Sequence, residues 1–257
     1  MNIGFIGVGK ISSALVEGFC TSQLKDYAIY LSPRGEGNSK RLAQQFEAVH
    51  RLESNQQVVD ASDFVFLSVL PKDVERVVEE LIFKEHQIVI NLTPFFVQAE
   101  LEKAVLPAKH ASKAVPLPSV IYHNCPIPVL NPIKEVMDLF SYIGQPLPVD
   151  TEQNMHTIWT ITGLISPFYD MMGTVSDWAK NLGVEPAIAD QYVADMYQSL
   201  AYAAQQSKPV DFEGLAEHAA TPGGMNEQAG REIRASKSHE AYKDASDNLL
   251  ARFKSRL

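Results

Sequence analysis

Small residues near the start of the sequence are spaced as in a phosphate-binding turn. Gly7 and Gly9 follow a short apolar run, and Ser12 stands where a third glycine often lies. Gly7 permits a tight turn, and Gly9 lets the backbone approach a pyrophosphate at the N-terminus of the next helix. Lys10 and Ile11 open that helix. The pattern predicts a dinucleotide site that includes Gly7, Gly9, Lys10 and Ile11.

Ser32 and Arg34 indicate which ribose this site accepts. An NAD site usually places an acidic residue about 20 positions beyond the glycines, where it binds the ribose 2′-hydroxyl. Counting about 20 residues from Ser12 leads to Ser32, where no acid stands, although Glu36 follows two residues after Arg34. A hydroxyl and a guanidinium suit a 2′-phosphate, so we expect NADP(H) as cofactor, with NAD(H) possible.

Two further sequence segments end predicted strands with residues that could border the same cofactor. In open α/β sheets, ligands bind at the carboxyl ends of the strands. Ser68, Val69, Leu70 and Pro71 close one apolar run, and Asn91 closes the next. We therefore include these five residues in the predicted cofactor site.

A glycine pair late in the chain predicts a second anion site. Gly223 and Gly224 precede a helical pattern, and their backbone N–H groups are expected to be open at that helix N-terminus. Met225 and Asn226 begin the helix, and the Asn226 amide can also donate. The sequence predicts that a substrate carboxylate binds at Gly223, Gly224, Met225 and Asn226, and that Glu227 could pair with a substrate amine.

The elements that position these residues alternate over roughly the first half of the chain, as expected of a parallel sheet covered on both faces. The predicted strands are Asn2–Ile6, Ala28–Leu31, Phe64–Leu70 and Gln87–Leu92, with a later one running into Ala114–Ser119; the predicted helices are Lys10–Cys20, Ser39–Phe46 and Val74–Ile82.

The pattern changes near Gly144. Gly144–Pro148 cannot be helical and is expected to end the sheet-forming part. Asp150 and Gln153 are spaced as in a capping box that opens a long helix, and only helical patterns follow. We predict an α/β fold in which a Rossmann-like dinucleotide-binding domain (1–148) is followed by an all-α domain (149–257).

The charge balance and the cysteine count exclude several classes of binding partner and cellular location. The 257 residues include 22 basic and 31 acidic side chains, for a net charge of −9. Such a surface disfavours nucleic acid and anionic membrane. The two cysteines, Cys20 and Cys125, form no disulfide framework, no apolar run is long enough to span a membrane, and no signal peptide is recognised. We expect a cytoplasmic protein. The histidines show no metal-ligand spacing, so no metal is expected.

Four anchors in this order resemble the pyrroline-5-carboxylate reductase family in its bacterial form. They are Gly7–Gly9, Val69 with Pro71, Ser166–Tyr169 and Thr221–Gly224. The resemblance spans nearly the whole chain. It implies a dinucleotide-binding domain followed by a helical dimerisation domain. It also implies reduction of a cyclic imine carrying a carboxylate, with NADPH or NADH, as in proline biosynthesis.

The chain departs from this family at positions expected to line the substrate pocket. Leu70 replaces a lysine, Pro116–Ser119 replaces Pro-Asn-Thr-Pro, Met225 and Asn226 replace a pair of Thr or Ala-Thr residues, and Phe168 replaces a small residue. The cofactor end is retained. These differences predict the same reaction type on a substrate that differs in its ring or substituents.

The candidate catalytic residues have two sources. By the resemblance, Asn226 takes the position of the family's hydroxyl donor. Because reduction of an imine needs a proton donor near its nitrogen, Tyr169 in the long helix is the first candidate donor, with Asp170 second. One alternative is a β-hydroxyacid dehydrogenase relative, which needs a lysine in the long interdomain helix; none stands between residues 151 and 172. Another is a non-catalytic, dinucleotide-binding regulatory protein.

One predicted helix offers an interface. Pro186 suits its first turn, and Tyr192, Met196 and Leu200 lie on one stripe that no sheet covers. We expect a homodimer or a higher homo-oligomer, with a small-molecule imine as the other partner.

Overall fold

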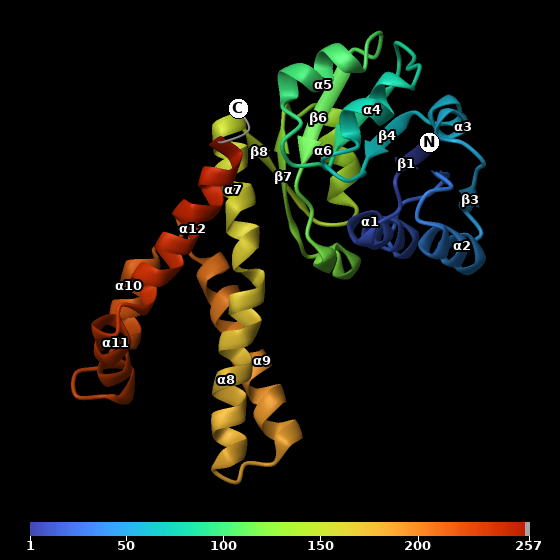
Figure 1. Cartoon of the computed structure of the whole chain (residues 1–257). Coiled ribbons are helices and arrows are strands. Elements are labelled where there is room, and N and C mark those ends of the chain that lie inside the picture. The colour runs from blue at the N-terminus through green and yellow to red at the C-terminus, as the bar shows by residue number, and fades with distance from the viewer. Residues whose placement is uncertain (255–257) are drawn as a thin grey trace. The chain divides into compact units, whose positions relative to one another are not determined.

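The computed structural model describes residues 1–254, which form two compact units, Met1–Trp159 and Thr160–Lys254 (Figure 1). Helix α7 (Glu152–Ile161) crosses the division between the units. The expected domain boundary between residues 148 and 149 therefore stays a prediction.

The described part of the first unit is built on one eight-stranded sheet in the order β3-β2-β1-β4-β5-β6-β7-β8. Its strands are β1 (Asn2–Ile6), β2 (Ala28–Leu31), β3 (Val49–Arg51), β4 (Phe64–Leu67), β5 (Ile88–Asn91), β6 (His110–Ala114), β7 (Pro126–Leu130) and β8 (Gln145–Val149). Neighbouring strands are parallel except β6 and β7, which are antiparallel. The strand order reverses between β1 and β4, which is where such sheets bind ligands.

Helices cover both faces of this sheet, as predicted. One apolar core involves α1 (Lys10–Thr21), α2 (Glu36–Gln45), α6 (Lys134–Ser141) and the short 3-10 helix η1 (Pro118–Tyr122); the other involves α3 (Asn55–Ala61), α4 (Val74–Glu79) and α5 (Gln98–Ala104). In the first core the rings of Phe5 and Phe66 stack with centroids 4.7 Å apart. The predicted α/β fold class is confirmed.

The central strands end earlier than the apolar runs do. The predicted strand Phe64–Leu70 stops at Leu67, because Ser68 donates its last ladder bond to the Ile6 carbonyl and the chain then turns toward Pro71. The residues released from the strand form the loop before α4. The shorter strand therefore places Ser68–Pro71 at the carboxyl edge of the sheet.

The proline-rich segment that was expected to end the sheet is itself the last strand. Gln145–Val149 forms β8, which pairs in parallel with β7 and lies at the edge. Pro146 and Pro148 are tolerated there because an edge strand needs hydrogen bonds on one side only.

The remaining helices are η2 (Thr162–Leu164), α8 (Ile165–Asn181), α9 (Pro186–Gln206), α10 (Phe212–Ala219), α11 (Met225–Ala235) and α12 (Ser238–Lys254). The single long helix expected from Asp150 is wrong: η2 separates α7 from α8, and Thr151 caps α7 by accepting from the Asn154 amide at 3.1 Å. Pro186 begins α9 as predicted. Among the described residues, no helix is both long enough and apolar enough to cross a membrane.

Candidate functional site

The glycine-rich turn after β1 is held by three neighbouring segments. Gly7 has φ +92°, and a Cβ there would lie 2.5 Å from the Ser68 carbonyl oxygen, so only glycine fits. The Gly7 amide donates to the Ser32 hydroxyl at 2.8 Å, and Ser12 donates to the Gly7 carbonyl at 2.8 Å. The ends of β1, β2 and β4 therefore meet at this turn.

Helix α1 begins directly after the turn with an open end. Its N-cap, Gly9, is extended and makes no side-chain capping bond. Apart from Gly9 itself and its two chain neighbours, no described residue has an atom within 4 Å of where a Cβ at Gly9 would be, and Lys10 is exposed beside it. The first amides of α1 lack intrahelical partners and suit an anion such as a pyrophosphate. The predicted phosphate end of the site thus fits a dinucleotide.

Ser32 and Arg34 lie in the loop after β2, but in different environments. Ser32 is fully buried, and its hydroxyl accepts the Gly7 amide. Its structural role is to hold the turn, and its contact with a 2′-phosphate stays a prediction. Arg34 is 57% exposed and pairs with Asp73 at 2.9 Å. Asp73 belongs to the loop after β4 and was missing from the predicted site.

The loops after β4 and β5 also reach this edge of the sheet. Ser68, Val69 and Pro71 are partly buried, whereas Leu70 is 57% exposed. Asn91 is fully buried, and its side chain bonds to the backbone of Thr93 and the carbonyl of Phe96. Asn91 therefore shapes the turn after β5, and its direct contact with the cofactor stays a prediction.

An ionic cluster near the end of β6 was not anticipated. Lys113 is fully buried on β6 and pairs with Glu152, the first residue of α7. The same carboxylate lies 3.0 Å from the ring of His156 one turn later, and it accepts the Gln98 amide at 2.8 Å. The cluster fastens the start of α7 to the sheet and to α5.

Burial sets the protonation of this cluster. Desolvation lowers the pKa of Lys113, an effect that the neighbouring Glu152 carboxylate opposes. Desolvation likewise lowers the pKa of His156, again opposed by Glu152 and reinforced by the charge of Lys113. The spacing of Glu152 and His156 on one helix face was the available sequence signal, whereas nothing local pointed to Lys113.

Tyr169 and Phe168 lie in α8. The Tyr169 side chain is 65% exposed, and its ring is 5.6 Å from that of Phe168. The Phe168 ring also meets Tyr197 of α9 edge-on at 6.1 Å. Phe168 thus takes part in packing between α8 and α9, while Tyr169 is largely exposed.

The turn before α11 differs from its expected open form. The Gly223 amide donates to the Glu227 carboxylate at 2.8 Å, and the Gly224 amide donates to the Thr221 carbonyl at 2.8 Å. The expectation that both glycine N–H groups are open is therefore wrong. Asn226 donates one amide N–H to the Ala219 carbonyl at 3.1 Å, and Met225 is 88% exposed. The backbone amides that begin α11, at Met225 and Asn226, lack intrahelical acceptors.

Within residues 1–254 no group of three or more His, Cys, Asp or Glu side chains is arranged to hold a metal ion.

Two known families match successive parts of the chain. Residues 2–94 match the family described as NADP oxidoreductase coenzyme F420-dependent, and residues 152–256 match Pyrroline-5-carboxylate reductase dimerisation. Pyrroline-5-carboxylate reductase of Corynebacterium melassecola is 24% identical over 261 residues, covering 93% of this chain and 93% of that protein. The Staphylococcus haemolyticus reductase is 24% identical over 259 residues, covering 95% and 93%.

Solved structures share the whole fold. The Streptococcus pyogenes 1-pyrroline-5-carboxylate reductase has a TM-score of 0.85 at 21% identity, covering 99% of this chain and 98% of that one. A Plasmodium falciparum pyrroline carboxylate reductase with NADP bound has a TM-score of 0.85 at 14% identity, covering 100% and 98%.

The glycine-rich turn, the open α1 start and the fold define a dinucleotide-binding oxidoreductase that uses NAD(P)H. Its second unit matches the pyrroline-5-carboxylate reductase dimerisation domain, and the chain is similar to pyrroline-5-carboxylate reductases over nearly its whole length.

Proposed function

We propose that the chain reduces the C=N bond of a cyclic imine that carries a carboxylate, as in proline-type biosynthesis. The observation that carries this proposal is the Gly7 turn with its open helix start, in a chain whose second half retains Thr221–Gly224. The bound NAD(P)H supplies the hydride. The residues of the chain bind and orient both reactants and provide a proton for the imine nitrogen.

Tyr169 is the proposed proton donor. Its side chain is largely exposed on α8, and its ring lies beside that of Phe168, which packs on Tyr197. A donor held near the imine nitrogen favours hydride transfer, because the product amine carries the added proton.

The proposed substrate differs from pyrroline-5-carboxylate in its ring or substituents. Leu70 is an exposed apolar side chain where the family has a lysine, and exposed Met225 begins α11. Asn226 retains a second N–H and an amide oxygen for a ring or nitrogen atom. The amides of Met225 and Asn226 would receive the carboxylate.

The β-hydroxyacid dehydrogenase alternative has little support in the second unit. The only lysine in α8 is Lys180, near its end, and it pairs with Asp177 at 3.2 Å and with Asp190 at 2.7 Å. A lysine held by two carboxylates is poorly placed to act on a substrate. The non-catalytic alternative is distinguished by assay, because only an enzyme oxidises NADPH when an imine is added.

The deciding assay is NADPH oxidation with five- and six-membered cyclic imines, each tested with and without its carboxylate. We expect turnover of a carboxylate-bearing ring. Asn226→Ala should lower kcat/KM for that imine, through a loss of about 0.5–1.5 kcal/mol of transition-state stabilisation. The affinity for NADPH should stay unchanged. Asn248→Ala, at an exposed position on α12, is the matched control. Absence of turnover with every imine would contradict the proposal.

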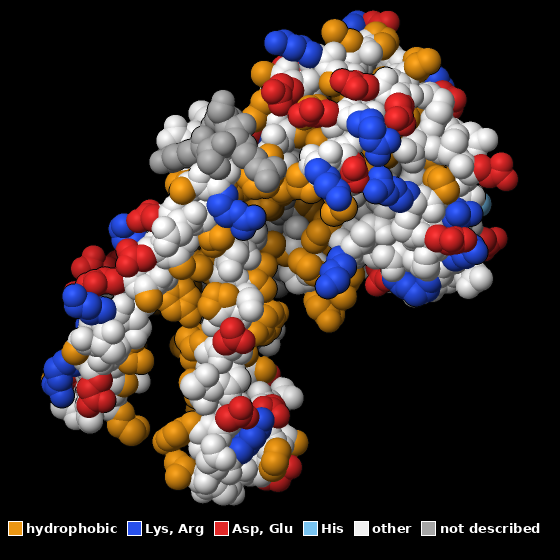
Figure 2. Space-filling model, in the orientation of Figure 1, with side chains coloured by type: hydrophobic (Ala, Val, Ile, Leu, Met, Phe, Trp, Pro, Cys, Tyr) orange, Lys and Arg blue, Asp and Glu red, His pale blue; other side chains and the backbone are white. Residues whose placement is uncertain are grey.

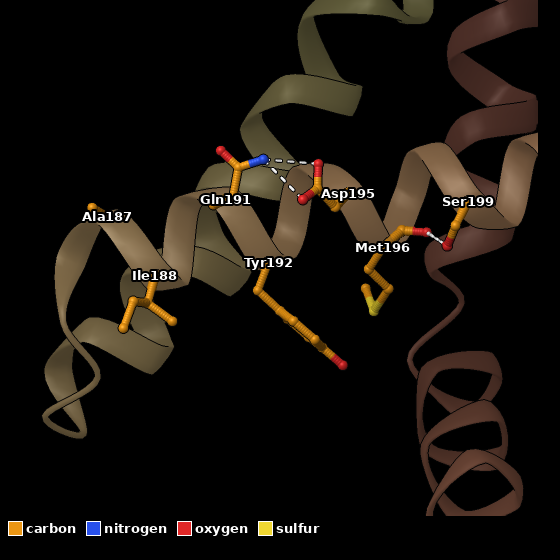
Figure 3. Close-up of a pocket in the computed structure, with 7 residues that line it drawn as sticks. All are labelled: Ala187, Ile188, Gln191, Tyr192, Asp195, Met196 and Ser199. Atoms are coloured by element: carbon orange, nitrogen blue, oxygen red, sulfur yellow. Dashed lines mark hydrogen bonds between the residues drawn. The ribbon is translucent and has the colours of Figure 1, made fainter.

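A homodimer is proposed through α9. A pocket of about 830 Å³ lies along this helix, and Figure 3 shows Ile188, Tyr192 and Met196 pointing to the same side of it. Hydrophobic side chains gather along the helices of this unit (Figure 2). Tyr192 is 67% exposed and Leu200 59% exposed, which is costly unless a second copy covers them.

A further inference from the structure

A carboxylate reaches the ribose end of the cofactor site from an unexpected strand. Arg34 follows β2, Asp73 follows β4, and β1 lies between these two strands in the sheet. The 2.9 Å ion pair therefore joins the two loops that flank the Gly7 turn. No acid stands at the position of Ser32, but Asp73, 39 residues after Arg34, brings one to the same place.

Asp73 and Arg34 differ in how far they are buried and in how they are bonded to the backbone. Asp73 begins α4: its amide donates to the Leu70 carbonyl at 2.9 Å, its carbonyl accepts from Val77, and its side chain is only 15% exposed. Arg34 is 57% exposed at the end of a long side chain. The carboxylate is thus the more buried partner, and the guanidinium is the more exposed one.

The backbone that carries Arg34 is also fixed. Gly35 has φ +83°, and a Cβ there would lie 2.5 Å from the Val8 carbonyl, so this loop packs closely on the glycine-rich turn. Asn38 donates to the same carbonyl at 3.0 Å. The loop after β2 can therefore present Arg34 to a bound dinucleotide without moving its backbone.

Positive charge exceeds negative charge around the Arg34–Asp73 pair, which favours a bound anion. Asp73 faces Arg34 at 2.9 Å and Arg76 at 3.8 Å, so one carboxylate lies between two guanidinium groups. Glu36, the other acid of the β2 loop, pairs with Lys40 at 2.6 Å. A 2′-phosphate could pair with Arg34 while Asp73 retains Arg76.

We propose that Arg34 and Asp73 read the ribose 2′ position in opposite senses, so that this chain accepts both NADPH and NADH. Arg34 would hold the 2′-phosphate of NADPH through charge-assisted hydrogen bonds. Asp73 would accept a hydrogen bond from the 2′-hydroxyl of NADH, as the acid of an NAD site does. Asp73 is then a specificity-determining residue that disfavours the phosphate and favours the hydroxyl. The inference rests on NAD(P)H binding at this turn and is independent of which imine is reduced.

The test is direct titration of NADPH and NADH by fluorescence, with no imine present. Asp73→Asn should lower the Kd of NADPH about threefold or more and raise that of NADH by a similar factor, because one acceptor charge is lost. Arg34→Gln should raise the Kd of NADPH about tenfold or more and leave NADH within about twofold. Opposite shifts of the two cofactors in Asp73→Asn are the result that a merely structural role cannot produce.

Glu36→Gln is the matched control, since it removes an acid from the same loop that is already paired with Lys40, and it should change neither Kd by more than about twofold. Asp73 makes no side-chain capping bond to α4, so Asp73→Asn should keep the fold, and Asp73→Ser provides a second variant. A shift of both cofactors in the same direction, or wild-type protein that binds NADPH but shows no NADH binding, would overturn the proposal. These titrations contain no imine, so neither result changes the test of the proposed function, which is turnover of an imine.

Discussion

Glu227 accepts a hydrogen bond from the Gly223 amide at 2.8 Å, across one turn at the start of α11. A carboxylate of the chain therefore occupies part of the cradle that the sequence assigns to a substrate carboxylate. Two carboxylates at one helix start repel each other, and only one can use the Gly223 N–H.

Glu227→Gln should consequently improve the binding of a carboxylate-bearing imine. Removing the charge weakens the internal bond and the repulsion together, so we expect the KM for that imine to fall about threefold to tenfold. The Kd for NADPH should not change. Steady-state kinetics check this, with Glu232→Gln on the same helix as the control, because Glu232 pairs with Gln228 away from the turn. A KM that rises instead would mean that Glu227 attracts a positively charged substrate group.

Ser32 should matter for both cofactors equally. Ser32→Ala leaves the buried Gly7 amide without its acceptor, which costs about 1–3 kcal/mol. The loss falls on the turn itself, so the melting temperature should drop and the affinities for NADPH and NADH should decrease in parallel. Ser13→Ala is the control: the Ser13 hydroxyl is buried with no hydrogen-bond partner among the described residues, and its removal should be neutral or stabilising. Selective loss of NADPH in Ser32→Ala would instead support direct contact with the 2′-phosphate.

The sequence was sufficient to predict the first half of the sheet because its signals are local. Apolar runs such as Asn2–Ile6 and Ala28–Leu31 become strands with those bounds, and Gly7 and Gly9 define the turn by their own steric properties. The short strand β3 was not predicted, since three residues carry too little periodicity.

The parts that sequence could not supply depend on contacts between distant segments. Asp73 joins the site only because β1 lies between β2 and β4, and no local pattern encodes that neighbour relation. Lys113 meets Glu152 for the same reason. At α11 the local signal is itself ambiguous, because the two glycines predict an open N-terminus while Glu227, at capping distance, is an internal acceptor for the Gly223 amide.

His156 should make stability depend on pH in the mildly acidic range. Burial lowers its folded-state pKa below the ordinary 6.5, while the unfolded chain still takes up a proton near that value. Between these two values the unfolded state binds more protons, so the free energy of unfolding rises with pH across this window. The contribution is fully present above 6.5 and is lost as pH falls through the folded pKa.

Thermal or denaturant unfolding across this pH range provides the measurement. His156→Gln should flatten the dependence, and His239→Gln, at an exposed position in α12, should leave it unchanged. Glu152 and Lys113 are the charged groups that the pKa of His156 responds to. An identical slope in His156→Gln would assign the pH dependence to another group.

We expect the exposed apolar stripe of α9 to form the homodimer interface. Tyr192 lines the α9 pocket with Ile188 and Met196, and a second copy covering this stripe would form an interface above roughly 1,000 Å². Tyr192→Asp would place an unpaired carboxylate in that apolar contact, so we expect the dimer dissociation constant to rise by about 100-fold or more. Light scattering over a dilution series measures it, with Gln198→Lys as the control because Gln198 is exposed on α9 outside the pocket. Wild-type protein that is monomeric at micromolar concentration, or a dimer that Tyr192→Asp leaves intact, would contradict this interface.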